Sequence, residues 1–301
     1  MSTPHTIIML RPKHFGFNNE TKFTNTFQNK VNEDEDFIKN IAKYEFDSMV
    51  NQLKENNISV DVFEDSETIL PDAVFINNWI SIFPEGQLVI YPMLAKNRRM
   101  EKRRDIIDRI IEKYDITEFI DLSHYEEEDK FLEGTGSVVF DFKNKLAFAC
   151  KSSRTNEDVF NDLCNRIGYK GFIFNSVDLL GKPIYHTNVM MTIFDKVVII
   201  CSKSIENALE RNMILSALKN TGRTIIDLSF TQLNQFIANS FEVINSDGES
   251  IIIMSRTAYY NLDEIQLKKL NSFSKILPVN ISIIERIGGA SARSLLTGVN
   301  C

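Results

Sequence analysis

Residues 137–176 read SVVFDFKNKLAFACKSSRTNEDVFNDLCNRIGYKGFIFNS and contain one complete unit of the predicted fold. Two short apolar runs, SVVFDF and KLAFACK, are typical of paired strands joined by a turn. The segment TNEDVFNDLCNRI predicts a helix, and GFIFNS predicts a third strand. The unit is therefore strand, turn, strand, helix, strand.

The same order of elements recurs along the chain. The unit before this one has predicted strands at 73–83 and 88–91, a helix at 98–114 and a strand at 116–121. In that helix one face carries Ile106, Ile107, Ile110 and Ile111. The next two units are NVMMTIFDKVVIICS, IENALERNMILSALKN and RTIIDLS (188–229), then FEVINSDGESIIIMS, a helix near LDEIQLKKLNSFS and the strand NISIIE (241–285).

The fifth unit is split between the two ends of the chain. SARSLLTGV at 291–299 is predicted to pair with TIIMLRP at 6–12, and residues 34–55 and 58–64 supply the helix and the last strand. Five ββαβ units whose first and last pieces meet predict an α/β fold that closes as a five-bladed pseudo-symmetric propeller. The alternative is a mixed sheet with accidental regularity, but all five units share one internal order. We therefore expect a single domain over residues 1–301.

Composition and charge narrow the class of protein. The 301 residues are 43% hydrophobic and carry a net charge of −7, which argues against a nucleic-acid partner. No apolar run approaches the roughly 18 residues of a membrane span, and the N-terminus has no signal-peptide pattern. The four cysteines, Cys150, Cys164, Cys201 and Cys301, form no metal-ligand spacing. We expect a cytoplasmic protein with no cofactor and no metal.

Polar residues gather where each unit begins. These unit starts are PDAVFINNW at 71–79, EGTGS at 133–137, HTN at 186–188, Asn239, and GGASARS at 288–294. Taken singly, each has an ordinary structural interpretation as a turn, an edge or a core polar residue. Equivalent positions around one axis converge, however, which predicts a shared pocket.

The residue types at these starts fit nucleophilic catalysis. A nucleophile needs a base within hydrogen-bond reach, and a third group must orient the base. Ser294, His186 and Glu133 are the candidates for these three roles. Ser294 is the weakest, because a serine hydroxyl needs far stronger activation than a cysteine thiol.

Several long motifs in one order resemble the amidinotransferase or pentein superfamily of arginine deiminases, dimethylargininases and glycine amidinotransferases. Within it the chain most resembles the citrulline-utilization hydrolases, the CtlX-like branch. The motifs are LRPKHFGFNNET (10–21), PDAVFINNWIS (71–81), YPMLAKNRRMEKRRDII (91–107), FLEGTGSVVFD (131–141), SSRTNE (152–157), GKPIYHTNVMM (181–191) and GGASAR (288–293). They extend over essentially the whole chain.

The resemblance implies that a thiolate attacks the carbon of a ureido or guanidino group, with His186 as acid and base and Glu133 orienting it. The cysteine of the family follows Ala-Arg in the last motif, where this chain has Ser294. Cys301, the last residue, is not expected to replace it. Two explanations stay open: Ser294 is an engineered change, or it is natural and the protein is an inactive relative.

The resemblance also implies residues that bind the substrate. The positions matching the carboxylates that hold a guanidinium are Asn78 and Asn188, and a neutral ureido group suits amides better than a cation does. Arg98 and Arg154 match positions that hold the α-carboxylate of the substrate, although Arg98 also fits a solvated helix face. The remaining candidates are Asp72, which fits a turn equally well, and Asn77.

The predicted function is hydrolysis of citrulline to ornithine, ammonia and carbon dioxide through a covalent intermediate, with the chain as written impaired by Ser294. One alternative is an arginine deiminase-like or dimethylargininase-like hydrolase of a guanidino substrate. Another is a non-catalytic pentein that binds a small amino acid or a protein partner. A homo-oligomer is left open.

Overall fold

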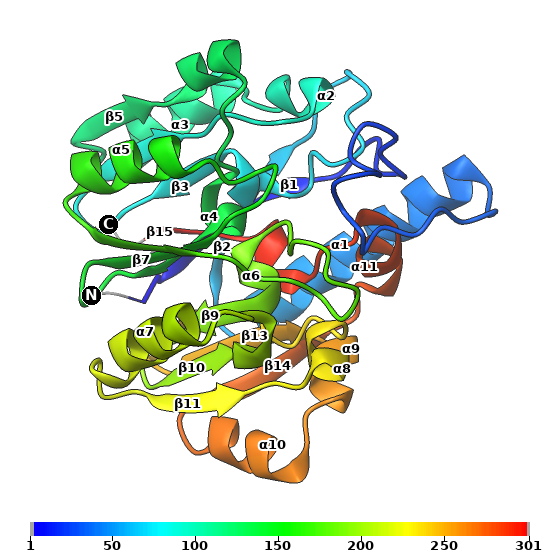
Figure 1. The fold of residues 1–301 in the computed structure, drawn as a ribbon. Helices are drawn as coiled ribbons and strands as arrows, with labels where there is room; N and C mark the ends of the chain where they lie inside the picture. The colour runs from blue at the N-terminus through cyan, green and yellow to red at the C-terminus, as the bar shows by residue number, and fades with distance from the viewer. Residues whose placement is uncertain (1–2, 300–301) are drawn as a thin grey trace.

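The computed structural model describes residues 3–299 and contains five three-stranded sheets (Figure 1). In each sheet the central strand pairs antiparallel with one neighbour and parallel with the other. In hydrogen-bonding order, the sheets are β15 (Thr297–Val299), β1 (Thr6–Arg11), β2 (Ser59–Glu64); β3 (Ile80–Ile82), β4 (Gln87–Ile90), β5 (Glu118–Asp121); β6 (Val138–Asp141), β7 (Leu146–Cys150), β8 (Lys170–Phe174); β11 (Thr224–Asp227), β10 (Val197–Ile200), β9 (Met191–Ile193); and β12 (Phe241–Ile244), β13 (Ser250–Ser255), β14 (Lys275–Val279).

Each parallel pair needs a crossover, and a helix supplies it. The crossover helices are α1 (Glu35–Glu55), α3 (Arg104–Lys113), α5 (Glu157–Ile167), α7 (Ala208–Lys219) and α10 (Glu264–Asn271). Shorter helical elements are η1 (Ile76–Asn78), α2 (Lys96–Arg99), η2 (Ser123–Glu128), α4 (Gly134–Ser137), α6 (Thr187–Met190), η3 (Ser202–Ser204), α8 (Phe230–Leu233), α9 (Arg256–Tyr260), α11 (Ser282–Gly288) and η4 (Ala292–Leu295).

The apolar core lies between the sheets and their helices. On α1, for example, Phe46, Met49 and Leu53 are fully buried and pack with Ile7 and Met9 of β1. Burying such side chains contributes about 1.5–3 kcal/mol each. In the described part of the chain, no helix combines the length and apolar character needed to cross a bilayer.

The predicted order of elements is confirmed in all five sheets, including the split one. β15 pairs antiparallel with β1, with Thr6 opposite Val299, so the two ends of the chain share a sheet. The mixed α/β class is therefore confirmed. Closure of the five sheets into a propeller goes beyond these pairings and stays a prediction.

The predicted strand NISIIE is wrong. Residues 275–279 form the strand β14, and residues 282–288 form the helix α11. β14 contains Pro278 and lies at the edge of its sheet, where a missing N–H is tolerated. The helix depends on a distant residue: the Glu45 carboxylate accepts hydrogen bonds from the backbone N–H groups of Ile283 and Ile284.

Three further boundaries differ from the prediction, at the starts of the first, third and fifth units. Residues 73–79 are not strand but turns that include η1, residues 187–190 form α6 before β9 begins, and residues 292–295 form η4 before β15 begins. These segments are almost entirely buried, and burial alone does not distinguish a helical turn from a strand in the sequence.

The predicted helix 98–114 is two helices, α2 and α3. The buried side chain of Arg98, in α2, donates to the carboxylate of Glu101, which lies between the two helices. The backbone N–H of Glu101 donates to the Arg98 carbonyl, so the chain makes a tight turn after α2. The isoleucine face is confirmed for Ile106, Ile107 and Ile110, which are buried.

The cap of α11 provides a test of the corrected boundary. Glu45→Ala removes the acceptor of two backbone N–H groups and of the Ser282 hydroxyl. We expect the free energy of unfolding to fall by about 1–3 kcal/mol in urea denaturation. Asp47→Asn, on the same helix, removes only the half-exposed pair with Arg11 and should cost at most about 1 kcal/mol. Equal losses in both variants would contradict the capping role.

Candidate active site

Four short helical turns lie at the starts of the sheets and carry the predicted site residues. Asn77 and Asn78 lie in η1, Glu133 immediately precedes α4, His186 precedes α6, and Ser294 lies in η4. The structure thus places the candidates on equivalent turns from different parts of the chain.

Two glycines let these turns approach each other. Gly134 has φ +47°, and a Cβ there would lie 2.3 Å from the Asn77 carbonyl oxygen. A Cβ on Gly136 would lie 2.6 Å from both Asn78 Nδ2 and His186 Nδ1. No side chain fits either position, so EGTG is a packing motif that holds η1 against α4 and His186 against Gly136.

Glu133 and His186 form a buried pair. His186 Nε2 lies 2.8 Å from Glu133 Oε2, and both side chains are essentially inaccessible to solvent. Arg154 Nη1 donates to the same carboxylate oxygen at 3.2 Å. With the Nε2 proton directed to Glu133, Nδ1 is the nitrogen of His186 that is left to accept or deliver a proton.

The surroundings set the charge of this pair. Burial lowers the pKa of His186 to about 4, against the opposing effect of Glu133, so the imidazole is neutral near pH 7. Burial alone would raise the pKa of Glu133, but the Arg154 guanidinium and the hydrogen bond from His186 hold it well below its ordinary range. The site therefore pairs a neutral base with an ionised carboxylate.

Arg98 lies in the centre of a second buried network. Its Nε and Nη2 donate to the two oxygens of Glu101, each at 2.9 Å, and its Nη1 donates to Asn78 Oδ1 at 2.8 Å. Its nearest contacts to Asp72 and Glu133 are 3.9 and 3.8 Å. Arg98 is thus not on a solvated helix face. Its guanidinium positions the Asn78 amide and compensates the charge of the surrounding carboxyl groups. The predicted contact with substrate stays a prediction.

Several buried polar atoms in this region have no partner in the protein. They are Asp72 Oδ1, Arg154 Nε and both side-chain amide atoms of Asn188. Buried polar groups are normally hydrogen-bonded, so unpartnered ones are candidate contacts for a polar ligand. Asp72 and Arg154 belong to the charge network around Glu133, whereas Asn188 lines a neighbouring cavity. Asn77, in contrast, donates to Thr135 Oγ1 at 3.2 Å and accepts from Asn78 at 3.0 Å, so its amide is used inside the protein.

Ser294 is held by Asn239. The Ser294 hydroxyl donates to Asn239 Oδ1 at 3.3 Å, and the same oxygen accepts the backbone N–H of Ser291 at 3.1 Å. Asn239 Nδ2 donates in turn to the Asn188 carbonyl at 3.2 Å. Within residues 3–299 no hydrogen bond joins Ser294 to His186, so the serine is not activated by the base in this arrangement.

The thiols do not supply another nucleophile. Cys150, Cys164 and Cys201 are buried and unpaired, and burial raises their pKa values to about 11, 12 and 11. Such thiols stay protonated and unreactive at neutral pH. Cys301 lies outside the described residues. In the described chain no group of three or more His, Cys, Asp or Glu residues is placed to hold a metal ion.

Sequence reasoning missed the segment that covers the site. Asn18 Nδ2 donates to Asp72 Oδ2 at 2.8 Å, and Arg154 Nη2 donates to Thr24 Oγ1 at 2.9 Å. Asn25 Nδ2 donates to the Gly288 carbonyl at 3.0 Å. This covering segment, residues 18–25, has no periodicity that would have revealed its role. Glu101 was also missed, although its spacing of three from Arg98 was a usable signal.

The neutral state of His186 predicts a dependence of stability on pH. Because its pKa in the folded protein is below that of an unfolded histidine, its contribution is complete above about pH 6.5 and is lost as the pH falls toward 4. Glu101, whose pKa burial raises to about 7, acts in the opposite direction. The test is therefore the difference in urea unfolding between the parent and His186→Gln at pH 7 and pH 4.5. The difference in the free energy of unfolding between the two proteins should be about 2 kcal/mol smaller at pH 4.5 than at pH 7. The control is His124→Gln, since His124 is exposed. A constant difference for His186→Gln would contradict a neutral, buried imidazole.

Solved structures of similar fold come from enzymes of arginine metabolism. ArgZ, an arginine dihydrolase of the ornithine-ammonia cycle in cyanobacteria, superposes with a TM-score of 0.74 at 18% identity over 97% of this chain. The chain spans 40% of the length of ArgZ, but 97% of its isolated N-terminal domain solved as a substrate-bound mutant, again with a TM-score of 0.74 and 18% identity. A dimethylarginine dimethylaminohydrolase adduct has a TM-score of 0.67 at 13% identity, over 99% of this chain and all of that one.

A search of curated proteins found no match. The sequence profile described as N,N dimethylarginine dimethylhydrolase, eukaryotic, matches residues 11–300. This match extends over nearly the whole chain and agrees with the fold of the solved structures. The chain therefore belongs to the N,N-dimethylarginine dimethylhydrolase family, within the amidinotransferase or pentein superfamily of C–N hydrolases.

Proposed function

We propose that this protein binds a small amino acid with a ureido or guanidino side chain, and that its site is built to hydrolyse the C–N bond of citrulline. The observation that carries the proposal is the buried Glu133–His186 pair at 2.8 Å beside unpartnered polar atoms of Asp72, Arg154 and Asn188. The pair supplies acid and base, and the unpartnered atoms supply binding groups. The reaction is citrulline and water to ornithine, ammonia and carbon dioxide.

The amides support a neutral substrate. In Asn78 the amide oxygen accepts from Arg98 and Nδ2 donates to Asn77, which leaves one Nδ2 proton for a substrate. Asn188 offers both a donor and an acceptor. A ureido group carries a carbonyl oxygen and an NH₂ group, which match an amide donor and acceptor. A guanidinium offers only donors and prefers ionised carboxylates.

The other end of an amino acid has candidate partners as well. Arg154 has an unpartnered Nε, which suits a carboxylate, and Asp72 has an unpartnered Oδ1, which suits an ammonium. Thr24 of the covering segment accepts one Arg154 donor, and Asn18 donates to Asp72. Residues 18–25 therefore have to give up these contacts if a substrate is to pair with both groups.

Arginine is the second candidate, and two observations favour it. The buried network contains three carboxyl groups, from Asp72, Glu101 and Glu133, but only two guanidinium groups, from Arg98 and Arg154. Burial raises the pKa of Asp72 and Glu101, and a cationic substrate would favour their ionised forms. The structural relatives also include an arginine dihydrolase and an AgrE complex with L-arginine.

The catalytic roles follow from the same geometry. His186 is placed to protonate the leaving amine and then to activate water, with Glu133 fixing its orientation. Position 294 is the place for the nucleophile, and a serine held by Asn239 makes the chain as written inactive or strongly impaired. A non-catalytic protein that only binds the amino acid is the remaining alternative.

We take residues 1–301 as one catalytic domain whose five sheets close as a propeller. Hydrogen bonds between units, such as that from Thr187 Oγ1 to the Ser137 carbonyl at 2.6 Å, support closure.

The first test is restoration of the nucleophile. Ser294→Cys should raise ornithine and ammonia release from citrulline by at least about 100-fold over the parent, since a thiolate is the stronger nucleophile. Ser202→Cys is the matched control, because Ser202 is buried on the distant turn η3. Adding His186→Ala to Ser294→Cys should abolish the gain. If Ser294→Cys still binds citrulline but turns over no substrate, the protein is a binding module and the proposal fails.

The second test addresses the substrate. In the Ser294→Cys background, Asn78→Asp should shift the ratio of kcat/KM for arginine over citrulline toward arginine by at least about tenfold, because an ionised carboxylate favours a guanidinium. Asn188→Asp should shift it in the same direction, whereas Asn261→Asp on the surface should not. If Ser294→Cys already prefers arginine or dimethylarginine, the citrulline assignment is wrong and the guanidino alternative holds.

A further inference from the structure

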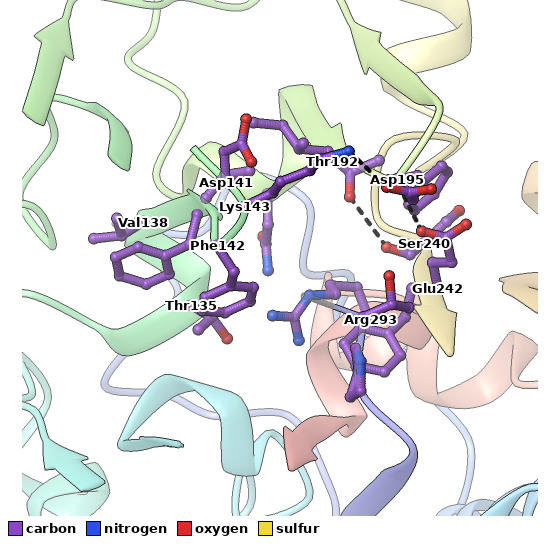
Figure 2. Close-up of a pocket in the computed structure, with 18 of the residues that line it drawn as sticks. Thr135, Val138, Asp141, Phe142, Lys143, Thr192, Asp195, Ser240, Glu242 and Arg293 are labelled. Atoms are coloured by element: carbon purple, nitrogen blue, oxygen red, sulfur yellow. Dashed lines mark hydrogen bonds and ion pairs between the residues drawn. The ribbon is translucent and has the colours of Figure 1, made fainter. Parts of the chain in front are cut away.

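A cavity of about 70 Å³ is lined by residues of the turns that carry the candidate catalytic residues. Thr135, Asn188 and Arg293 are among its lining residues, and Figure 2 shows Thr135 and Arg293 with others of the lining. Each lies close in sequence to one candidate catalytic residue. Thr135 is two residues after Glu133, Asn188 is two residues after His186, and Arg293 directly precedes Ser294. Glu133, His186 and Ser294 do not line the cavity, but Asn188, a predicted substrate ligand, does.

Arg293 is a cation without a counter-charge. Its Nη1 donates to the Leu296 carbonyl at 2.7 Å, and its guanidinium lies over the Phe241 ring, 4.8 Å from the centroid. Among residues 3–299 it forms no ion pair, and burial alone lowers its pKa to about 10. Arg98 shows the opposite effect: burial lowers its pKa, but the carboxylates of Glu101 and Asp72 outweigh this and raise it.

The carboxylates that line the same cavity are engaged elsewhere. Asp141 accepts two hydrogen bonds from Arg223, at 2.5 and 3.0 Å. Glu242 accepts from the backbone N–H of Asp195 at 2.7 Å and from the Ser250 hydroxyl at 2.7 Å. The third acid of the lining, Asp195, pairs with Lys196 at 2.9 Å and with Lys143 at 3.8 Å. None of the three acids pairs with Arg293, so guanidinium N–H groups other than the one bonded to the Leu296 carbonyl are open to a ligand.

Asn188 is the independent second observation. Its side chain is 2% exposed, lines the same cavity, and has neither its amide oxygen nor its amide nitrogen bonded to the protein. The Asn188 NH₂ and the Arg293 guanidinium both line the cavity and can donate to a ligand inside it. A planar oxyanion of three or four heavy atoms matches the fork of an arginine and fits the volume, whereas a larger ligand does not.

We propose that this cavity binds a small planar oxyanion of the carboxylate or bicarbonate type, held by Arg293 and Asn188. The anion would neutralise Arg293 and brace three turns that also position Glu133, His186 and Ser294. Because Asn188 is also a predicted substrate ligand, the test relies on Arg293.

The experiment is thermal unfolding of the full chain at pH 8 in sodium formate or sodium bicarbonate, against sodium chloride at the same ionic strength. We expect formate and bicarbonate to raise the thermal unfolding midpoint by about 2–5 °C over chloride, because each anion is present at a concentration well above its dissociation constant. Arg293→Gln should lose this increment. Arg104→Gln is the matched control, since Arg104 is exposed on α3 and should keep it.

A direct measurement covers the case in which Arg293→Gln does not fold. ¹³C-labelled formate should show concentration-dependent line broadening with the unmodified protein, reversed by excess bicarbonate. Equal midpoint shifts in the parent and Arg293→Gln would show a general salt effect and overturn the site. An increment that chloride reproduces, or no line broadening, would overturn the oxyanion assignment. None of these measurements depends on catalysis, so failure of the citrulline proposal leaves this result unaffected.

Discussion

The ionised carboxylate of Glu133, completely buried, is the constraint on which the rest of the site depends. A buried charge is costly unless it is paired and hydrogen-bonded. Here the compensation comes from His186 at 2.8 Å and Arg154 at 3.2 Å, which lie 53 and 21 residues further along the chain. These partners come from different parts of the fold, so satisfying one carboxylate brings separate units together.

The turns that carry the site residues can approach each other for two reasons. Glycines leave room where the turns touch, and the Asn239 side chain links turns of different units by hydrogen bonds. Gly134 and Gly136 leave no room for a Cβ between η1, α4 and His186. Asn239 then links the third, fourth and fifth units, through the Asn188 carbonyl, the Ser291 N–H and the Ser294 hydroxyl. Small residues and amides therefore fix the relative positions of the groups that carry the chemistry, while the sheets and helices provide the apolar core.

The same burial decides the protonation states and what the site can do. A neutral His186 and an ionised Glu133 are ready to move protons, but they do not activate Ser294, whose hydroxyl is directed to Asn239. The Glu133–His186 pair and the Ser294 hydroxyl therefore belong to separate hydrogen-bond networks in this structure.

The amino-acid sequence by itself determined the five repeated units, the pairing of the two chain ends, and the positions of Glu133, His186 and Ser294 at the starts of units. These features are local: they depend on apolar periodicity and on short motifs such as EGTGS. Only the tertiary structure decided that NISIIE is a helix, because its cap is the carboxylate of Glu45, 237 or more residues away. The same holds for the roles of Arg98, Asn239 and residues 18–25, and for the uncompensated charge of Arg293. Each depends on which groups meet after burial, and the energetic cost of leaving a buried polar group unpaired is a property of the folded interior that no local pattern contains.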